Sequence, residues 1–488
     1  MPKQFNFLRD AVRLFALSVA VFGMFTMSSA TAQEGAVYTM TNALDGNEIA
    51  AFARGRDGRL TSIGNFSTDG LGSTEFDGGE GLDPLISADS IIVSGDQQFL
   101  FAVNAGSDTI SSFRINRNFS LTLVDTVPSG GVGPNSLAIS GNRLFVSNID
   151  RDGLALGVEG TTRGEPNDEG NVTGFLVSSS GRMSPIRRST INLDNRPANI
   201  GFSADGTRLI ITSITAGSAA LPGPNAANSV VVYGVNSRGR VSRRMLGSAT
   251  GTQVGNAEGR NLGSAIDFDT TMIGNREFVV VTEAREFNAE GAPPILPALQ
   301  AGSVSVYELN PDGSLTSTED DFALGDPTAS PFDNASQLTT CWIDFGSDGR
   351  TFYVSNAINA TISSFRLLGN GRLRLLEEVA ASGVSGFSTG ETSGPGVFGT
   401  TDGFIDLDVS DDGRFLYQLE GLSGEISVYR VNSNRSLSLI QEVDGLPEID
   451  TQGIISVSNQ RDAQLLALIR LLLLLKAKLL SILFGFFF

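Results

Sequence analysis

The sequence predicts an all-β protein: a single seven-bladed β-propeller of four-stranded blades, with the ring closed by a C-terminal strand that completes blade one. Three observations predict this fold. A pair of strands recurs along the chain, each copy carries a turn signal and a further strand, and one unpaired strand remains at the end. The composition agrees, because 57 Gly and only 18% charged residues suit many short strands joined by tight turns.

The recurring pair of strands is clearest in two places. Phe101-Ala-Val-Asn104 precedes Thr109-Ile-Ser-Ser-Phe113, and Tyr353-Val-Ser-Asn356 precedes Thr361-Ile-Ser-Ser-Phe365 with the same spacing. The other copies of the pair fall within residues 38–52, 144–177, 209–235, 278–309 and 416–429. Together these segments predict the seven blades.

Each copy continues into a turn and a further strand. Asp57-Gly58, Asp312-Gly313 and Asn370-Gly371 would supply the positive-φ positions of a hairpin turn. Most copies are also preceded by a leading strand, but the first copy lacks one. We expect the spare strand Gly453–Val457 to pair into blade one, since this closes the ring and removes an open sheet edge.

The N-terminal residues 1–32 predict a cleaved signal peptide. Basic residues precede an apolar run from Leu14 to Met27, and Ala30-Thr31-Ala32 provides a cleavage site. A retained membrane anchor is the alternative, but the apolar run is short for a spanning helix. Residues 33–462 would then form an exported propeller, located in the periplasm or outside the cell.

The C-terminal residues 463–488 form a separate apolar tail rich in Leu and Phe. Arg470, Lys476 and Lys478 interrupt it, so that its longest uncharged run, Leu479–Phe488, is too short to span a bilayer. An interfacial helix is an alternative. We expect any membrane contact to occur only through this tail.

Charge excludes several classes of function. The chain has a formal net charge of −19 and no His, and its lysines all lie outside residues 33–462. An acidic body repels nucleic acid, and a propeller without His or Lys excludes a histidine base and a lysine Schiff base. The single Cys341 leaves no internal disulfide. An acid-rich, Lys-poor surface is typical of a protein exposed to a salty or acidic exterior.

Long connections predict where a ligand would bind. They lie between Asn148 and Phe175, Ser213 and Tyr233, and Glu283 and Tyr307, in three adjacent blades, and would wall one side of the channel mouth. The first is acidic and could bind calcium through oxygen ligands, although its spacing matches no calcium loop and a solvated acidic loop explains it better. We therefore expect no cofactor, with calcium left open.

Polar residues end the first strand of each recurring pair. Four of them are Asn residues, which we interpret as caps that satisfy the backbone where the strand turns away. Glu283 and Glu420 occupy this position in two copies, and Arg285 follows Glu283 closely. A carboxylate near Arg at a channel mouth can deprotonate water, but a surface salt bridge explains the same residues. The four caps are Asn42, Asn104, Asn148 and Asn356.

With these residues in view, the chain resembles the lactonase-like seven-bladed propellers, a family that includes 6-phosphogluconolactonase and carboxymuconate cyclases. The segments that carry the resemblance are Val279–Glu283, Cys341–Asn356 and Gly445–Ile454. The resemblance implies a site for a lactone or a sugar-derived molecule, with Glu283 as the catalytic carboxylate. Arg196 and Arg260 are the implied oxyanion or carboxylate partners.

Further candidate ligand contacts are Arg285, Glu420, Asn135 and Asn199. Enzymes of the family usually place histidines near the positions of Asn135 and Asn199, and this chain has none. Lactone hydrolysis is therefore left open. The alternative is a non-enzymatic propeller of the YVTN type, a cell-surface or extracellular module with a binding or structural role. We expect the ligand to be a small molecule or a glycan. In either case we expect a monomer.

Overall fold

The computed structural model describes most of the propeller body. The described residues are 33–73, 83–85, 87–149, 170–193, 196–214, 230–249, 264–284, 286–287, 298–299, 302–325, 337, 340–357, 359–383 and 403–458. The expected signal peptide and tail lie outside these residues. So do Arg260, Arg285 and the acidic connection after Ile149.

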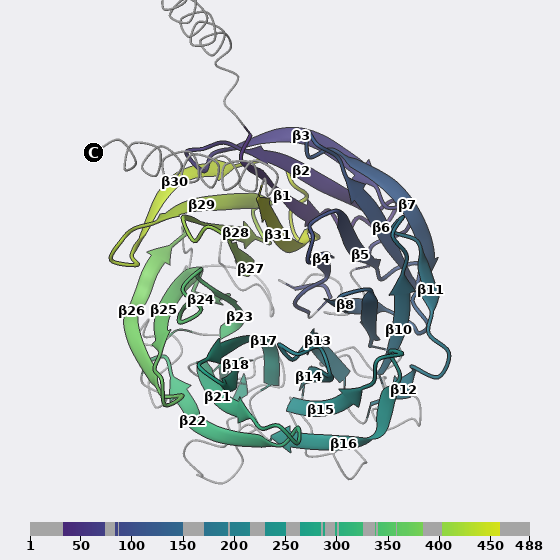
Figure 1. The fold of residues 1–488 in the computed structure, drawn as a ribbon. Helices are drawn as coiled ribbons and strands as arrows, with labels where there is room; N and C mark the ends of the chain where they lie inside the picture. The colour runs from purple at the N-terminus through teal and green to yellow at the C-terminus, as the bar shows by residue number, and fades with distance from the viewer. Residues whose placement is uncertain are drawn as a thin grey trace, which may run out of the picture.

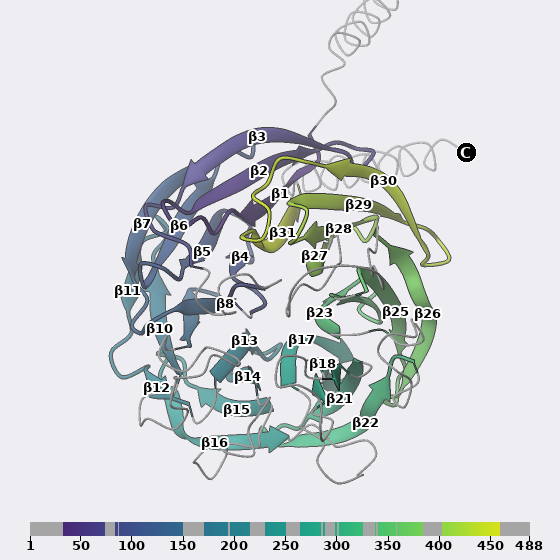
Figure 2. The same ribbon diagram turned by 180° about the vertical axis from the view of Figure 1, so that it is seen from behind.

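The described chain forms a ring of seven antiparallel sheets arranged as blades (Figure 1). In each blade the first strand lies nearest the ring axis and the last forms the rim, and the view from behind shows the same arrangement (Figure 2). The predicted seven-bladed β-propeller is therefore confirmed.

Each blade is assembled from consecutive strands, with one exception in blade one. The strands in order from the axis to the rim are as follows. Blade one contains β31 (Gln452–Ser458), β1 (Gly35–Met40), β2 (Glu48–Arg54) and β3 (Leu60–Ser67); blade two β4 (Ile91–Val93), β5 (Phe99–Asn104), β6 (Thr109–Ile115) and β7 (Leu121–Pro128); blade three β8 (Pro134–Ser140), β9 (Arg143–Asn148), β10 (Asn171–Val177) and the short strands β11 (Met183–Pro185) and β12 (Ile191–Asn192), which both pair with β10.

The remaining four blades follow the same order. Blade four contains β13 (Arg196–Phe202), β14 (Arg208–Ile214), β15 (Val230–Val235) and β16 (Val241–Ala249); blade five β17 (Ser264–Ile273), β18 (Arg276–Ala284), β21 (Ser303–Leu309) and β22 (Leu315–Ala323), with β19 (Glu286–Phe287) and β20 (Ala298–Leu299) forming a separate two-stranded sheet; blade six β23 (Thr340–Phe345), β24 (Thr351–Asn356), β25 (Thr361–Leu367) and β26 (Leu373–Ser382); blade seven β27 (Phe404–Val409), β28 (Phe415–Glu420), β29 (Glu425–Val431) and β30 (Leu437–Val443).

Burial explains why the second strands read as apolar runs. All six residues of β5 and of β24 are buried, because neighbouring blades cover both faces of the sheet. The residues of the rim strand β3 after Leu60 are instead exposed or half-buried, because no further strand covers the outer edge of the blade. The hydrophobic core therefore lies between the blades.

The hairpin before each rim strand differs in detail from the prediction. Gly58, Gly313 and Gly371 have positive φ, while the Asp or Asn before each does not. The Gly58 amide donates to the Gly55 carbonyl, and the Gly55 amide donates to the Arg59 carbonyl. The turn is thus a type I turn followed by a left-handed glycine, which needs one positive φ rather than two.

The ring closes where the two ends of the propeller meet. β31 pairs antiparallel with β1, and Ala36 lies opposite Val457. In Figure 1 the yellow β31 lies beside the purple β1, so the last strand of the chain becomes the innermost strand of the first blade. The predicted closure is confirmed, and it satisfies the edge that β1 would otherwise expose.

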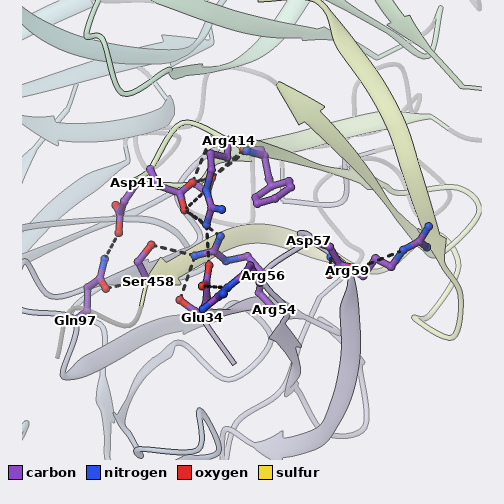
Figure 3. A network of polar contacts seen from close by, with 12 residues as sticks. Glu34, Arg54, Arg56, Asp57, Arg59, Gln97, Asp411, Arg414 and Ser458 are labelled. Atoms are coloured by element: carbon purple, nitrogen blue, oxygen red, sulfur yellow. Dashed lines mark hydrogen bonds and ion pairs between the residues drawn. The ribbon is translucent and has the colours of Figure 1, made fainter. Parts of the chain in front are cut away.

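A cluster of polar contacts, here called the clasp, lies at this closure (Figure 3). Arg54 is buried with only 1% of its side chain exposed; it pairs with Asp412 at 3.2 Å and donates to the Glu34 carbonyl at 3.1 Å. Arg414 bonds both Asp412 and the Glu34 carboxylate at 2.8 Å. The clasp therefore links Glu34, which directly precedes β1, to blade seven beside the end of β31.

Candidate functional site

The polar residues at the strand ends are held within their own blades. The Asn104 amide donates to Thr109 and Ser111 on the neighbouring strand, at 3.1 and 2.8 Å. The Asn356 amide makes the same pair of bonds with a threonine and a serine of β25. These two asparagines therefore bond side-chain hydroxyls of the neighbouring strand, rather than the backbone groups that we expected from the sequence.

Glu283 occupies the equivalent position in blade five. Ser303 and Ser305 donate to its two carboxylate oxygens at 2.7 and 3.1 Å, and only 1% of the residue is exposed. Its two hydroxyl partners correspond to those of Asn104. Glu420 in blade seven is also buried and accepts a hydrogen bond from Ser423 at 3.1 Å.

Asn135 and Asn199 are buried between the inner strands of blades three, four and five. The Asn135 amide donates to the Pro197 carbonyl at 2.9 Å, and its oxygen accepts a bond from Ser147. The Asn199 amide donates to Asp267 Oδ1 at 2.5 Å, and its oxygen accepts from Ser136. Both side chains therefore join strands around the axis, whereas Arg196 begins β13 and is partly exposed.

Two residues that precede β4, Ser87 and Ala88, contact blades six and four. The Trp342 indole of blade six donates to the Ser87 carbonyl at 2.9 Å, and the Ala88 amide donates to the Ala198 carbonyl of blade four. Leu85 is fully buried. This segment, which leads into β4, therefore packs at the inner ends of the blades.

A row of aspartates on the inner strands was not singled out by the sequence analysis. Asp267 accepts the Phe268 amide on Oδ1 and the Ile343 amide of blade six on Oδ2. Asp406 accepts the Leu407 amide and the Ile454 amide of blade one in the same manner. The signal was present in Ile266-Asp-Phe-Asp269, Trp342-Ile-Asp344 and Ile405-Asp-Leu-Asp408, where Asp recurs at the same positions of successive leading strands.

The most unusual electrostatics belong to Asp89 and Asp267. Burial raises the pKa of Asp89 to about 7, against the lowering effect of a hydrogen bond from Asn199. Burial also raises the pKa of Asp267 well above its ordinary value, and the charges of Asp89 and Asp406 add to the rise. The Asn199 amide thus donates to Asp267 and lies close to Asp89, and the charges of the two carboxyl groups oppose each other.

Such a pair can do acid–base chemistry. Two neighbouring carboxyls that disfavour a double negative charge share a proton, so one can donate while the other accepts. Raised pKa values near the operating pH are what a general base requires. We call Asp89 and Asp267 the axial pair.

The described residues contain no cluster of acidic, Cys or His side chains placed to hold a metal ion. Within the same residues, no helix has the length and apolar character needed to cross a membrane. The calcium site considered for the acidic connection lies outside the described residues.

Sequence comparison relates the chain to known propellers. A family model described as lactonase, seven-bladed β-propeller, matches residues 46–171 and 342–448. No curated protein matches the chain. The family match leaves out residues 172–341, which include Arg196, Asp267 and Glu283.

Solved structures share the fold at low sequence identity. The periplasmic gluconolactonase PpgL of Pseudomonas aeruginosa has a TM-score of 0.54 at 15% identity, over 87% of this chain and 99% of that one. A Bacteroides fragilis protein, whose description as a 6-phosphogluconolactonase is provisional, has a TM-score of 0.54 at 13% identity, over 88% and 100%. A hypothetical selenium-binding protein of Sulfolobus tokodaii has a TM-score of 0.52 at 11% identity, over 87% and 91%.

Fold and family model together define the class of protein: the chain is a lactonase-like seven-bladed β-propeller. The resemblance stated from the sequence is thus confirmed.

Proposed function

We propose that the chain is an exported propeller that hydrolyses a small lactone near the ring axis, with the axial pair as its acid–base group. The observation that carries this proposal is the placement of the Asp89 and Asp267 carboxyls beside Asn199, whose amide donates to Asp267. Asp89 is partly exposed while Asp267 is buried, so Asp89 is the member that water and substrate reach.

Lactone hydrolysis needs one proton removed from water and one proton given to the leaving oxygen. The ionised carboxylate takes a proton from a water molecule while the water oxygen bonds to the lactone carbonyl carbon. The ring C–O bond then breaks, and the leaving oxygen takes a proton from Asp89, which is the base in the first step. The product is a hydroxy acid, and the pair returns to its singly protonated state. Arg196, at the start of β13, is the proposed partner of the developing oxyanion.

Glu283 is the second candidate for the base. Its carboxylate already accepts two serine hydroxyls and is almost fully buried, in the geometry that the strand-end asparagines share. These contacts support a role in holding the strand end. Arg260, Arg285, Glu420, Asn135 and Asn199 remain proposed contacts of the site.

Turnover by the purified chain tests the proposal. A panel of sugar and muconate lactones would be offered to the wild-type protein and to the Asp89→Asn, Asp267→Asn and Glu283→Gln variants. Asp444→Asn, which removes an exposed carboxylate of blade seven, is the matched control. We expect a loss of about 100-fold or more in kcat for the axial variants, while Glu283→Gln and the control keep most of theirs. Full activity of Asp267→Asn would overturn the assignment.

A non-enzymatic binding module is the alternative, and one observation favours it. Ser87 and Ala88 contact the innermost strands of blades six and four, where a substrate of the proposed enzyme would lie. Binding of a sugar or glycan measured by calorimetry, without hydrolysis of any lactone, would support this alternative over the enzyme.

A further inference from the structure

Aspartates join the innermost strands of blades five, six, seven and one. In each case a carboxylate on one blade accepts a backbone N–H from the innermost strand of the next. The Val409 amide donates to Asp344 Oδ2 at 2.6 Å, and the Ile343 amide donates to Asp267 Oδ2 at 2.9 Å. Asp267, Asp344 and Asp406 accept the amides of Ile343, Val409 and Ile454 of the next blade, and Asp269 and Asp408 lie beside Phe345 and Ser456 of the next blade. We call these five residues the seam aspartates.

A neutral group makes the same link elsewhere in the ring. Between blades three and four, the Ile200 amide donates to the Ser136 hydroxyl at 3.1 Å. Ser136 lies on β8 where Asp267 lies on β17, so a hydroxyl that does not titrate can satisfy the inner edge of a blade. An ionisable acceptor is therefore not required by the geometry of the ring.

The seam aspartates are crowded by like charges. Among the described residues, none of the five forms an ion pair with an arginine. Asp408 Oδ2 is buried without a hydrogen-bond partner, although Arg54 of the clasp acts on Asp408 from the neighbouring blade. The groups that face the seam aspartates are Asp89 before β4, Asp411 after β27, Arg54 on β2, Cys341 on β23 and Tyr417 on β28, together with the other seam aspartates.

We propose that the seam aspartates make the cohesion of the ring depend on pH, so that blades five, six, seven and one hold together best in mildly acidic solution and loosen towards pH 8. Deprotonation would place a row of negative charges at the inner ends of adjacent blades. This pH dependence of the ring goes beyond the proposed lactone hydrolysis and does not depend on it.

Proton linkage gives the direction in which the stability of the fold changes with pH. Burial raises the pKa of Asp269 to about 6 and that of Asp408 to about 7, and it raises the pKa of Asp344 well above its ordinary value. A carboxyl whose pKa is raised by folding binds its proton more tightly in the folded state. Its stabilising contribution is complete below the unfolded pKa of about 4 and is lost as the pH rises through about 6 to 7.

The clasp determines the pH below which the folded protein loses stability. Burial would raise the pKa of the Asp412 carboxyl. Hydrogen bonds from Arg414 and Ser410 outweigh that effect and lower the pKa to about 2. The hydrogen bond from Arg414 likewise lowers the pKa of Glu34. These contributions are present above about pH 4 and disappear as the pH falls towards 2. The greatest stability is thus expected between about pH 4 and 5.

Thermal unfolding of the full chain between pH 3 and 9 tests the proposal. We expect the wild-type Tm to fall by roughly 5 °C or more between pH 5 and 8. Asp269→Asn and Asp344→Asn should each flatten this fall, because each removes a carboxyl that resists ionisation. Asp444→Asn, an exposed carboxylate of blade seven, should leave the slope unchanged.

Two results would overturn the proposal. One is a wild-type Tm that is constant or rises from pH 5 to 8. The other is an equal flattening by Asp444→Asn, which would place the pH dependence in the general charge of the surface. Because the wild-type curve alone can contradict the proposal, it stays testable even where a variant fails to fold. The readout is unfolding, so absence of lactone turnover does not affect it.

Discussion

Arg54 shows how one residue can depart from a repeat for a reason that the structure reveals. It ends the third strand of blade one, where the equivalent residues opposite the rim strand are aliphatic, such as Ile115, Leu309 and Leu367. Arg54 instead reaches Asp412 and the Glu34 carbonyl at the closure. The Phe415 ring lies 5.7 Å from its guanidinium carbon and covers it.

Substitution at Arg54 separates packing from charge. Arg54→Met places an apolar side chain at this position, as in the other blades, and Asp412 keeps Arg414 as a partner. We therefore expect the free energy of unfolding to fall by about 1 kcal/mol or less. Arg54→Ala leaves a cavity as well and should cost roughly 3 kcal/mol. Chemical denaturation measures both. A loss for Met as large as that for Ala would show that the charge, not the volume, of Arg54 stabilises the closure.

At the scale of an element, the rim hairpins connect successive blades. Gly58 has φ +90°, and a Cβ at this position would meet the Phe415 ring of blade seven at 2.2 Å. Gly181 makes the equivalent approach to Phe99, and Gly371 to Phe278. Glycine is therefore required here for two reasons: the turn needs a positive φ, and the preceding blade packs too closely for a Cβ.

Gly58→Ala should be strongly destabilising, by roughly 2–4 kcal/mol, because it strains the left-handed backbone and pushes into a ring that cannot move easily. Gly46→Ala is the matched control, since it lies in a connection of the same blade with open space around it. Denaturant midpoints compare the two variants. Equal midpoints would contradict the proposed contact between blades one and seven.

The strand β31 is the other element on which the ring depends. A chain that stops before Gln452 lacks the innermost strand of blade one and exposes the edge of β1. We expect such a chain to unfold at a Tm lower by about 10 °C or more and to aggregate, whereas a chain that stops after Ser458 should not. Light scattering during a thermal scan distinguishes the two. Identical behaviour would mean that β31 contributes little to closure.

At the scale of the whole molecule, the sequence predicts the ring well and the site poorly. The ring is predictable because Thr109–Phe113 and its copies repeat, and because the spare strand at Gly453 has one open edge to join. The sequence predicts the position of the turn at Gly58 but not its type. Asp57-Gly58 fits both a two-residue hairpin turn and a type I turn followed by a left-handed glycine.

The axial pair could not be found from local sequence. Asp89 precedes the inner strand of blade two and Asp267 lies on that of blade five, and only the curvature of the ring brings both to Asn199. In the sequence, Ile266-Asp-Phe-Asp269 reads as an ordinary alternating strand. Aligning the leading strands would have revealed the recurrent Asp, but not that Asp89 and Asp267 lie beside the same asparagine.

The measurement that most directly tests the functional account is the pH dependence of kcat/KM for lactone hydrolysis, at a temperature where the chain stays folded. A pair that shares one proton predicts a bell-shaped profile whose limbs belong to the pair as a unit. We expect Asp267→Asn to abolish that shape and Asp444→Asn to keep it. Hydrolysis with an unchanged profile in Asp267→Asn, or no hydrolysis of any lactone, would contradict the account.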